Sequence, residues 1–222
     1  MTWTDVAGGN SNAVGEGIFT ECLTGANGAA GRICELRGTV DSLLDFGASA
    51  LPDVFTMCTV TRYAGYFQNQ IIKGSDFLHG HDRGNTGVAY YWENMTNWNN
   101  KFLAVNTDWL IFCGQNAAPW HFLANGQSVG TLGSGPKPAG GIQIGVNICP
   151  GPGWDRGPSD FGITEIAIWN RTLSQDELSS MSRYYSDMLA NGNLGSLRRK
   201  HCFGILASSI LASSILFWYS CK

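Results

Sequence analysis

Charged side chains are scarce in this sequence, and the common motifs for nucleic acids and nucleotides are missing. Only 14% of the residues are charged, and the net charge is −3. A nucleic-acid surface needs clustered lysine and arginine, so this composition argues against a nucleic-acid partner. No Gly-x-Gly-x-x-Gly or phosphate-binding loop follows a predicted strand, so nucleotide binding has no support.

Paired-cysteine motifs and an apolar leader are also absent. None of the seven cysteines forms a Cys-x-x-Cys pair, which disfavours a zinc knuckle or a thioredoxin-like site. Residues 1–11 are polar and glycine-rich and lack the apolar segment of a signal peptide. We therefore expect a chain that has lost its signal or was cut from a longer extracellular protein. Residues 1–17 are predicted to be a linker or N-terminal extension.

The cysteines that are present favour disulfides. Cys22 and Cys34 flank a glycine-rich loop and would close it as a local bridge. Cys58 and Cys113 both lie in predicted core strands, so we predict that they pair. Spacing alone does not fix connectivity, and reduced thiols are the alternative in both cases.

Two N-glycosylation sequons accompany the cysteines, with Asn94 and Asn170 as acceptors. Cysteines and sequons together fit an oxidising, secretory route. We therefore predict an extracellular or cell-surface glycoprotein.

The segment from Ser159 to Met181 carries the strongest structural signal. It begins as a strand in which Phe161, Ile163, Glu165, Ala167 and Trp169 share one face. Ser174 then stands three residues before Glu177, the spacing of a helix capping box. The segment predicts a strand that turns directly into a short helix.

The rest of the chain reads as short strands separated by glycine and proline turns. Asn125-Gly126, between two short apolar segments, is a strong hairpin signal because both residues tolerate positive φ. We predict an all-β fold, a two-sheet antiparallel jelly-roll sandwich with one short C-terminal helix. The domain is expected to cover residues 18–190, followed by a linker and apolar tail over residues 191–222.

Three segments together resemble the laminin-G-like domains of the concanavalin-A-like superfamily. They are the strand FTMCTVTRY, the hairpin HFLANGQSVGTL and the closing segment ITEIAIWNRTLSQDEL, in the same order and spacing. The stretches SDFLHGHDRGNTGVAYYW and NTDWLIFCGQNAAPW further resemble modules of large secreted or surface proteins of algae and other protists. The resemblance covers roughly residues 18–190. It implies a binding, adhesion or structural module; some members of the superfamily bind glycans, often near a calcium ion.

A minority of that superfamily are glycoside hydrolases, whose usual signature alternates two or three carboxylates along one strand. This sequence contains no such alternation: Asp160 and Glu165 are five residues apart and would project to opposite faces of a strand. The chain is therefore predicted not to be an enzyme.

Aromatic residues near strand ends are the candidate sugar contacts, because aromatic rings stack on sugar rings. These are Trp92, Trp98, Trp120 and Trp154. The alternative is that they fill the core of a large sandwich.

Two groups of residues are candidate metal ligands. The loop over residues 147–160 offers hard oxygen donors for calcium in Asn147, Asp155 and Asp160, or it is simply a solvated loop. His79 and His81 share one face of a strand and suit zinc or copper, or they are metal-free and hydrogen-bonded. No resident cofactor is predicted, with calcium as the alternative.

An apolar run over residues 203–219 follows the basic residues Arg198, Arg199 and Lys200. It suits a short membrane span, a lipid-anchor signal, sequence outside the domain, or a strand that pairs with a neighbouring chain. We expect contact with a membrane only through this tail, if at all.

The function predicted from the sequence is a non-catalytic, extracellular adhesive or structural module of a surface or filamentous assembly. The alternative is a glycan-binding lectin domain, with or without calcium. The expected partners are copies of the same chain, other extracellular proteins, or glycans.

Overall fold

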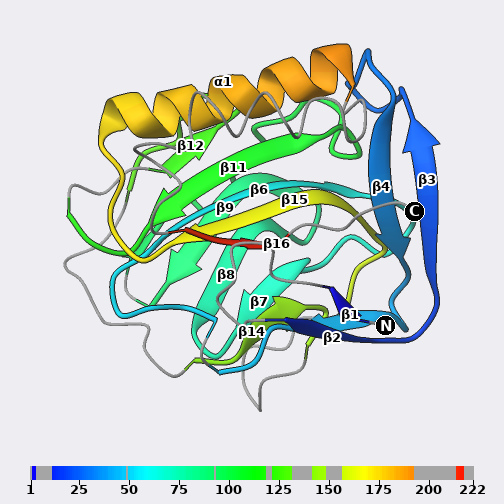
Figure 1. Cartoon of the computed structure of the whole chain (residues 1–222), viewed down its shortest axis with the longest axis horizontal. Coiled ribbons are helices and arrows are strands. Elements are labelled where there is room, and N and C mark those ends of the chain that lie inside the picture. Colours follow the sequence, from blue (N-terminus) through cyan, green and yellow to red (C-terminus); the bar gives the residue numbers. More distant parts are fainter. Residues whose placement is uncertain are drawn as a thin grey trace.

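The computed structural model describes residues 2–3, 12–48, 50–92, 94–118, 122–131, 142–148, 157–192 and 214–217. For residues 2–3, 21–24 and 214–217 only the backbone is described. Two antiparallel sheets face each other, and the helix α1 (Gln175–Asn191) lies along the outside of one of them (Figure 1). The predicted all-β sandwich with a C-terminal helix is confirmed.

Sheet A pairs strands from widely separated parts of the chain. Short strands from the N-terminal third of the chain pair with a strand that lies just before the closing segment in sequence. The spatial order of the strands therefore differs from their order in the sequence. Its strands in spatial order are β1 (Thr2–Trp3), β2 (Ala13–Glu16), β5 (Leu43–Asp45), β14 (Ile144–Val146), β7 (Ile72–Gly74), β8 (Phe77–Asp82), β9 (Asn85–Tyr91) and β10 (Asn94–Met95).

Sheet B contains the longest strands and supports the helix. Its strands in spatial order are β13 (Gln127–Ser128), β12 (Phe122–Ala124), β11 (Leu110–Gln115), β6 (Thr56–Tyr63), β15 (Phe161–Trp169), β4 (Ile33–Gly38) and β3 (Phe19–Thr24). A further strand, β16 (Ser214–Phe217), pairs with β15 beside this path.

Two apolar cores result, one on each face of sheet B. The core between the sheets includes Phe55, Tyr91 and Phe112, all fully buried. The second core lies between sheet B and the helix and includes Trp169 and Tyr185. Burying one such large side chain contributes roughly 1.5–3 kcal/mol, so the helix is held mainly by its apolar face.

A β-bulge in β15 decides which residues enter which core. The register against β6 shifts between Ile163 and Glu165, which inserts Thr164 as an extra residue. Phe161 and Ile163 therefore share the inter-sheet face with Ile166 and Ile168, whereas Ala167 and Trp169 face the helix. The prediction of one uninterrupted face through residues 161, 163, 165, 167 and 169 is wrong for this reason.

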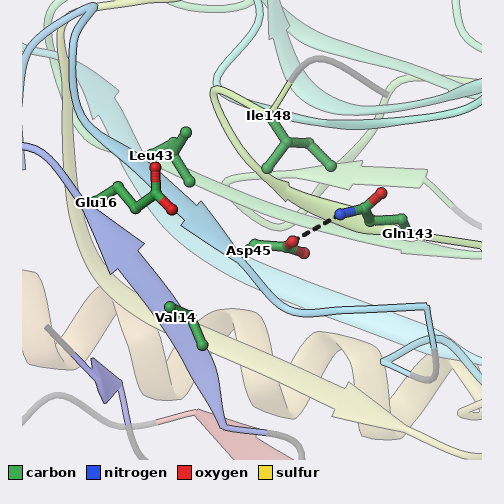
Figure 2. Close-up of a pocket in the computed structure, with 6 residues that line it drawn as sticks. All are labelled: Val14, Glu16, Leu43, Asp45, Gln143 and Ile148. Atoms are coloured by element: carbon green, nitrogen blue, oxygen red, sulfur yellow. Dashed lines mark hydrogen bonds between the residues drawn. The ribbon is translucent and has the colours of Figure 1, made fainter. Parts of the chain in front are cut away.

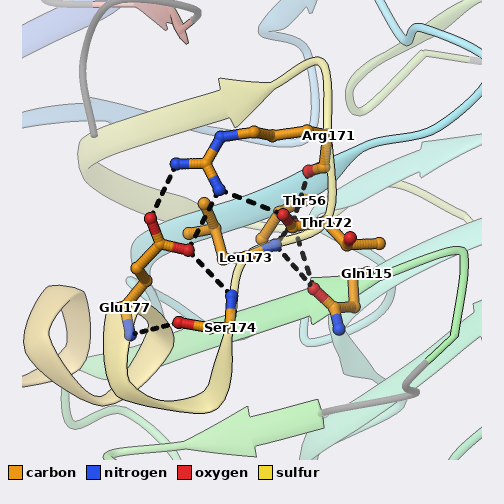
Figure 3. Close-up of polar contacts among 7 residues, drawn as sticks. All are labelled: Thr56, Gln115, Arg171, Thr172, Leu173, Ser174 and Glu177. Atoms are coloured by element: carbon orange, nitrogen blue, oxygen red, sulfur yellow. Dashed lines mark hydrogen bonds and ion pairs between the residues drawn. The ribbon is translucent and has the colours of Figure 1, made fainter. Parts of the chain in front are cut away.

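The helix starts with the predicted capping box. The backbone N–H of Glu177 donates to Ser174 Oγ, and Glu177 Oε2 accepts from the backbone N–H of Ser174 (Figure 3). The same turn is tied to sheet B, because the N–H of Leu173 donates to both Thr56 Oγ1 and Gln115 Oε1. The direction in which α1 leaves the sheet is thus fixed by polar contacts at its first turn.

Part of the predicted linker or N-terminal extension over residues 1–17 forms strands in the structure. Thr2–Trp3 pairs with β2, and β2 pairs with β5 over Val14 to Glu16. Part of the predicted apolar tail also belongs to the sheet, since Ser214–Phe217 pairs with β15. Within the described ranges, no helix is both long and apolar enough to cross a membrane.

Candidate functional site

A pocket of about 240 Å³ opens on the outer face of sheet A, where β2, β5 and β14 lie side by side (Figure 2). Carboxylate and amide groups stand next to aliphatic side chains in this pocket. Its lining residues are Val14, Glu16, Leu43, Asp45, Gln143 and Ile148.

Strand alternation brings the first four of these side chains to the outer face. Ala13 and Leu44 point into the inter-sheet core, so their neighbours along each strand point outward. The register places Val14 opposite Asp45, and Glu16 opposite Leu43. One aliphatic and one acidic side chain from each strand therefore meet at the pocket.

The Asp45 carboxylate is held in place from two sides. The backbone N–H of Gly47 donates to its Oδ1 at 2.7 Å, the local bond that aspartate commonly makes in a turn. Gln143 Nε2 donates to its Oδ2 at 2.6 Å (Figure 2). A carboxylate and an amide thus stand in a fixed relative position at the edge of the pocket.

Ile148 reaches the pocket just after a bend at Asn147, which follows β14. Asn147 has a left-handed φ of 55°, and its Nδ2 donates to the carbonyl oxygens of Thr39, Ser42 and Ser159. Gly145 leaves the room that Ile148 needs, since a Cβ there would lie 2.7 Å from the Ile148 side chain.

Asn147 is one of the predicted calcium ligands, and in the structure its side chain has this structural role. Its Oδ1, the atom that would bind calcium, accepts the backbone N–H of Ser159 at 2.8 Å. Asp160 has a similar role: Oδ1 accepts from the N–H of Val40, and Oδ2 from the N–H of Phe67. Asp155 lies outside the described residues. Among the residues that the structure does describe, no three acidic, histidine or cysteine side chains form a metal-binding cluster.

Of the predicted aromatic contacts, Trp92 and Trp98 do not line this pocket. Trp92 is half-buried in the turn between β9 and β10 and packs against the inter-sheet core, with a left-handed φ of 56°. Trp98 is half-buried and stacks on Tyr90, with ring centroids 5.7 Å apart. Trp120 and Trp154 lie outside the described residues. The strands β7 and β8 separate the pocket from Tyr90 and Trp98 on sheet A, so the two features are distinct.

His79 and His81 lie between the sheets and are fully buried. His79 Nε2 contacts Thr59 Oγ1 at 3.1 Å, and its Nδ1 contacts the Tyr91 hydroxyl at 2.5 Å. His81 Nδ1 contacts Thr61 Oγ1 at 3.5 Å. Burial lowers the pKa of each imidazole from 6.5 to about 3. Both histidines are therefore neutral, hydrogen-bonded core residues that link the sheets.

The predicted disulfide between Cys58 and Cys113 is present. The two residues face each other across β6 and β11, with Cα atoms 4.1 Å apart, on the side that the helix covers. Cys34 is also disulfide-bonded. The Cys22 side chain lies outside the described part of the chain, so its pairing with Cys34 stays a prediction.

The two sequons differ sharply in exposure. Asn170 is exposed in the turn between β15 and α1. Asn94 is only 1% exposed, and Thr96 of the same sequon is hydrogen-bonded to the backbone of Ala89. A glycan on Asn94 would have to leave the protein from a buried side chain, so the structure favours Asn170 as the acceptor.

Sequence reasoning missed the pocket because two of its six lining residues, Val14 and Glu16, come from a segment predicted to be a linker or N-terminal extension. The alternation of Ala13, Val14, Gly15 and Glu16 was the one available signal, and it is too short to stand out from a polar, glycine-rich context. Gln143 and Ile148 flank a strand of only three residues, so their meeting with β2 depends on tertiary pairing.

No protein-family model matches this chain, and no curated protein matches it in sequence. Solved structures do resemble it in fold. One is domain 4 of AbnA, a GH43 extracellular arabinanase from Geobacillus stearothermophilus, in complex with arabinotriose. The two are 10% identical, with a TM-score of 0.56 over 78% of this chain and 90% of that one.

The binding domain of botulinum neurotoxin DC, in complex with rat synaptotagmin II, is 11% identical, with a TM-score of 0.53. A botulinum neurotoxin type C structure, from work on cell entry through two ganglioside molecules, is 12% identical, with a TM-score of 0.51. Each alignment covers 82% of this chain and 50% of the neurotoxin chain. At these identities the likeness establishes the β-sandwich fold alone.

Proposed function

We propose that this chain is a non-catalytic glycan-binding module and that the pocket between β2, β5 and β14 holds one sugar residue. The observation that carries the proposal is the hydrogen bond between Asp45 and Gln143 at 2.6 Å, beside the aliphatic side chains of Leu43 and Ile148. This module corresponds to the lectin alternative that the sequence suggested.

The chemistry of the pocket suits a polyhydroxylated ring. A carboxylate accepts hydrogen bonds from sugar hydroxyls, and a glutamine amide both donates and accepts. Leu43 and Ile148 provide apolar surface for the C–H groups of the same ring. Ligand sites typically combine such apolar walls with a few fixed polar groups.

The structural neighbours support a binding role for this fold. The arabinanase domain is in complex with arabinotriose, and the neurotoxin domains interact with ganglioside or with synaptotagmin II. Fold likeness does not transfer a ligand from one protein to another, so the pocket itself must carry the assignment.

Binding is favoured over hydrolysis by the surroundings of the two carboxylates. A general acid holds its proton in apolar, enclosed surroundings, whereas Glu16 is exposed and Asp45 already accepts two hydrogen bonds. Asn147 Oδ1 and both Asp160 carboxylate oxygens accept backbone N–H groups, and neither residue lines the pocket, so the proposed binding uses no metal.

The Cys58–Cys113 disulfide supports a secreted or surface location, because disulfides persist in oxidising compartments. The resemblance to laminin-G-like modules points the same way. An adhesive role would follow if the glycan belongs to a neighbouring cell or matrix.

A glycan array with the full chain, followed by calorimetry on the best ligand, tests this proposal. Asp45→Asn should weaken binding by roughly 10- to 100-fold, because a hydrogen bond to a charged group contributes about 1.5–3 kcal/mol. Asp187→Asn, at an exposed position on α1, is the matched control and should bind as the unaltered chain does. An array without hits, or equal affinity of Asp45→Asn and Asp187→Asn, would contradict the proposal.

A further inference from the structure

The two edges of β15 pair with different strands. One edge pairs with β6 from Phe161 to Trp169. The other edge pairs with β4 only from Phe161 to Ile163. β4 thus covers the first third of this edge and leaves Ile166–Trp169 for another strand.

The bulge at Thr164 marks the point where β4 leaves. A bulge bends its strand and locally disrupts the ladder, and β4 pairs with β15 only before it. Beyond the bulge, β4 continues through Glu35, whose carboxylate lies 2.7 Å from the Arg62 guanidinium in a buried ion pair. Gly162 makes room for this pair, since a Cβ there would lie 1.9 Å from Glu35 Oε1.

Beyond the bulge, the C-terminal segment of the same chain pairs with this edge. Ile166 pairs with Phe217, Ile168 with Ile215, and Trp169 with Ser214, in an antiparallel register. Figure 1 shows β16 lying along β15 as a separate short strand. Residues 193–213 connect it to α1 and span roughly 70 Å when extended.

We infer that the Ile166–Trp169 edge is a strand-acceptor site, and that a second copy of this chain fills it with its own Ser214–Phe217. The strand that the edge accepts has the sequence of this chain, so the same segment of another copy offers the same backbone partners and side chains. Exchange of an identical element between copies creates an interface without new contacts. Mutual exchange gives a dimer, and one-way exchange gives a filament.

Concentration decides between the intramolecular and intermolecular arrangements. Both contain the same β15–β16 pairing, and a covalent connection through a flexible linker typically gives an effective concentration in the mM range. Exchange should therefore dominate only where copies are crowded, as on a surface or in an assembly. This inference is independent of the glycan pocket, which lies on sheet A.

Cross-linking between two variants of the full chain tests the inference. One copy carries Ile168→Cys and the other carries Ile215→Cys, with different affinity tags. Directly opposite residues in neighbouring strands have Cα atoms about 4.5–5.5 Å apart, within the range of a disulfide. After incubation at mM concentration and oxidation, non-reducing mass mapping should find position 168 of one tag linked to position 215 of the other. The yield should fall on dilution.

The control mixture replaces Ile215→Cys by Gln127→Cys, at an exposed site on the far edge strand β13, and should give at least tenfold less of the linked product. A chain that carries both Ile168→Cys and Ile215→Cys reports the intramolecular pairing. Linkage within that chain but not between copies would overturn the exchange, and no linkage in either would overturn the acceptor site itself.

A second measurement does not depend on altering the core residue Ile168. Two differently tagged copies of the unaltered chain should co-purify after incubation at mM concentration. Ile215→Pro with Leu216→Pro should abolish this, because at least one ladder hydrogen bond to β15 is lost. Ile215→Val with Leu216→Val should retain it. Co-purification that persists in the proline variant would also overturn the inference.

Discussion

Arg171 and Glu177 form a two-point ion pair across the turn that joins β15 to α1. Arg171 Nη1 donates to Glu177 Oε2 at 3.0 Å, and Nη2 donates to Oε1 at 2.8 Å (Figure 3). The same carboxylate accepts the N–H of Ser174. The capping box and the ion pair thus share one side chain, and that side chain fixes where the helix begins.

Glu177→Gln should lower the free energy of unfolding by about 1 kcal/mol, the usual size of a lost helix cap. The bonds from Arg171 lower the pKa of the Glu177 carboxyl from 4.5 to about 2. This stabilisation is complete above pH 4.5 and is lost as the pH falls toward 2. Urea unfolding at pH 7 and pH 3 measures it: the variant should differ from the unaltered chain less at pH 3. An equal difference at both values would contradict the role of the ionised carboxylate.

His79 and His81 should make the protein sensitive to mild acid. In the unfolded chain both take up protons below about pH 6.5, whereas in the folded protein burial lowers both pKa values to about 3. Stability is therefore unaffected above pH 6.5 and falls continuously between pH 6.5 and 3. At pH 5 the loss is roughly 2 kcal/mol for each histidine.

Chemical denaturation between pH 7 and pH 5 tests this slope. His81→Gln removes one of the two groups and should reduce the pH dependence by about half, whatever its stability at pH 7. An unchanged slope would show that other groups cause the acid sensitivity.

Removal of the Cys58–Cys113 disulfide should destabilise the fold without changing its topology. The two cysteines are separated by 55 residues in sequence, for which the chain-entropy model gives about 4 kcal/mol. Cys58→Ala with Cys113→Ala should therefore lower the thermal midpoint markedly while the circular dichroism stays that of a β-protein. Non-reducing mass mapping of the unaltered chain should find the linked peptide, and free thiols at both positions would contradict the pairing.

Glycan attachment should occur at Asn170 and not at Asn94. Asn170 is exposed, whereas Asn94 is 1% exposed and lies in a paired strand. Expression in a glycosylating host followed by intact-mass analysis should show that Asn170→Gln removes a glycan and Asn94→Gln removes none. A glycan found on Asn94 would mean that β10 is not packed as the structure shows.

The helix and the two-sheet architecture were predictable because their signals are local. Ser174 and Glu177 are close in sequence, and the capping box depends only on that spacing. The strand content follows from alternation and turn residues over a few positions. The Cys58–Cys113 pairing was also within reach, because both cysteines lie in clearly apolar strands.

The faces of β15 were not predictable. Alternation counts residues in one strand, whereas the bulge at Thr164 is defined by the register against β6. The backbone contacts of Asn147 and Asp160 were not predictable either: both side chains are hydrogen-bonded to backbone groups from segments distant in the sequence, and no spacing rule reveals those partners.

By itself, the sequence determined that this chain forms a β-sandwich closed by a capped helix, since alternation, turns and caps act over a few residues. Only the tertiary structure decided where the pocket lies and which edge of β15 pairs with the C-terminal strand. The pocket joins Glu16 and Asp45 to Gln143, and the acceptor edge joins β15 to a segment beyond the helix. Both depend on strand order and register, which arise when distant parts of the chain pair.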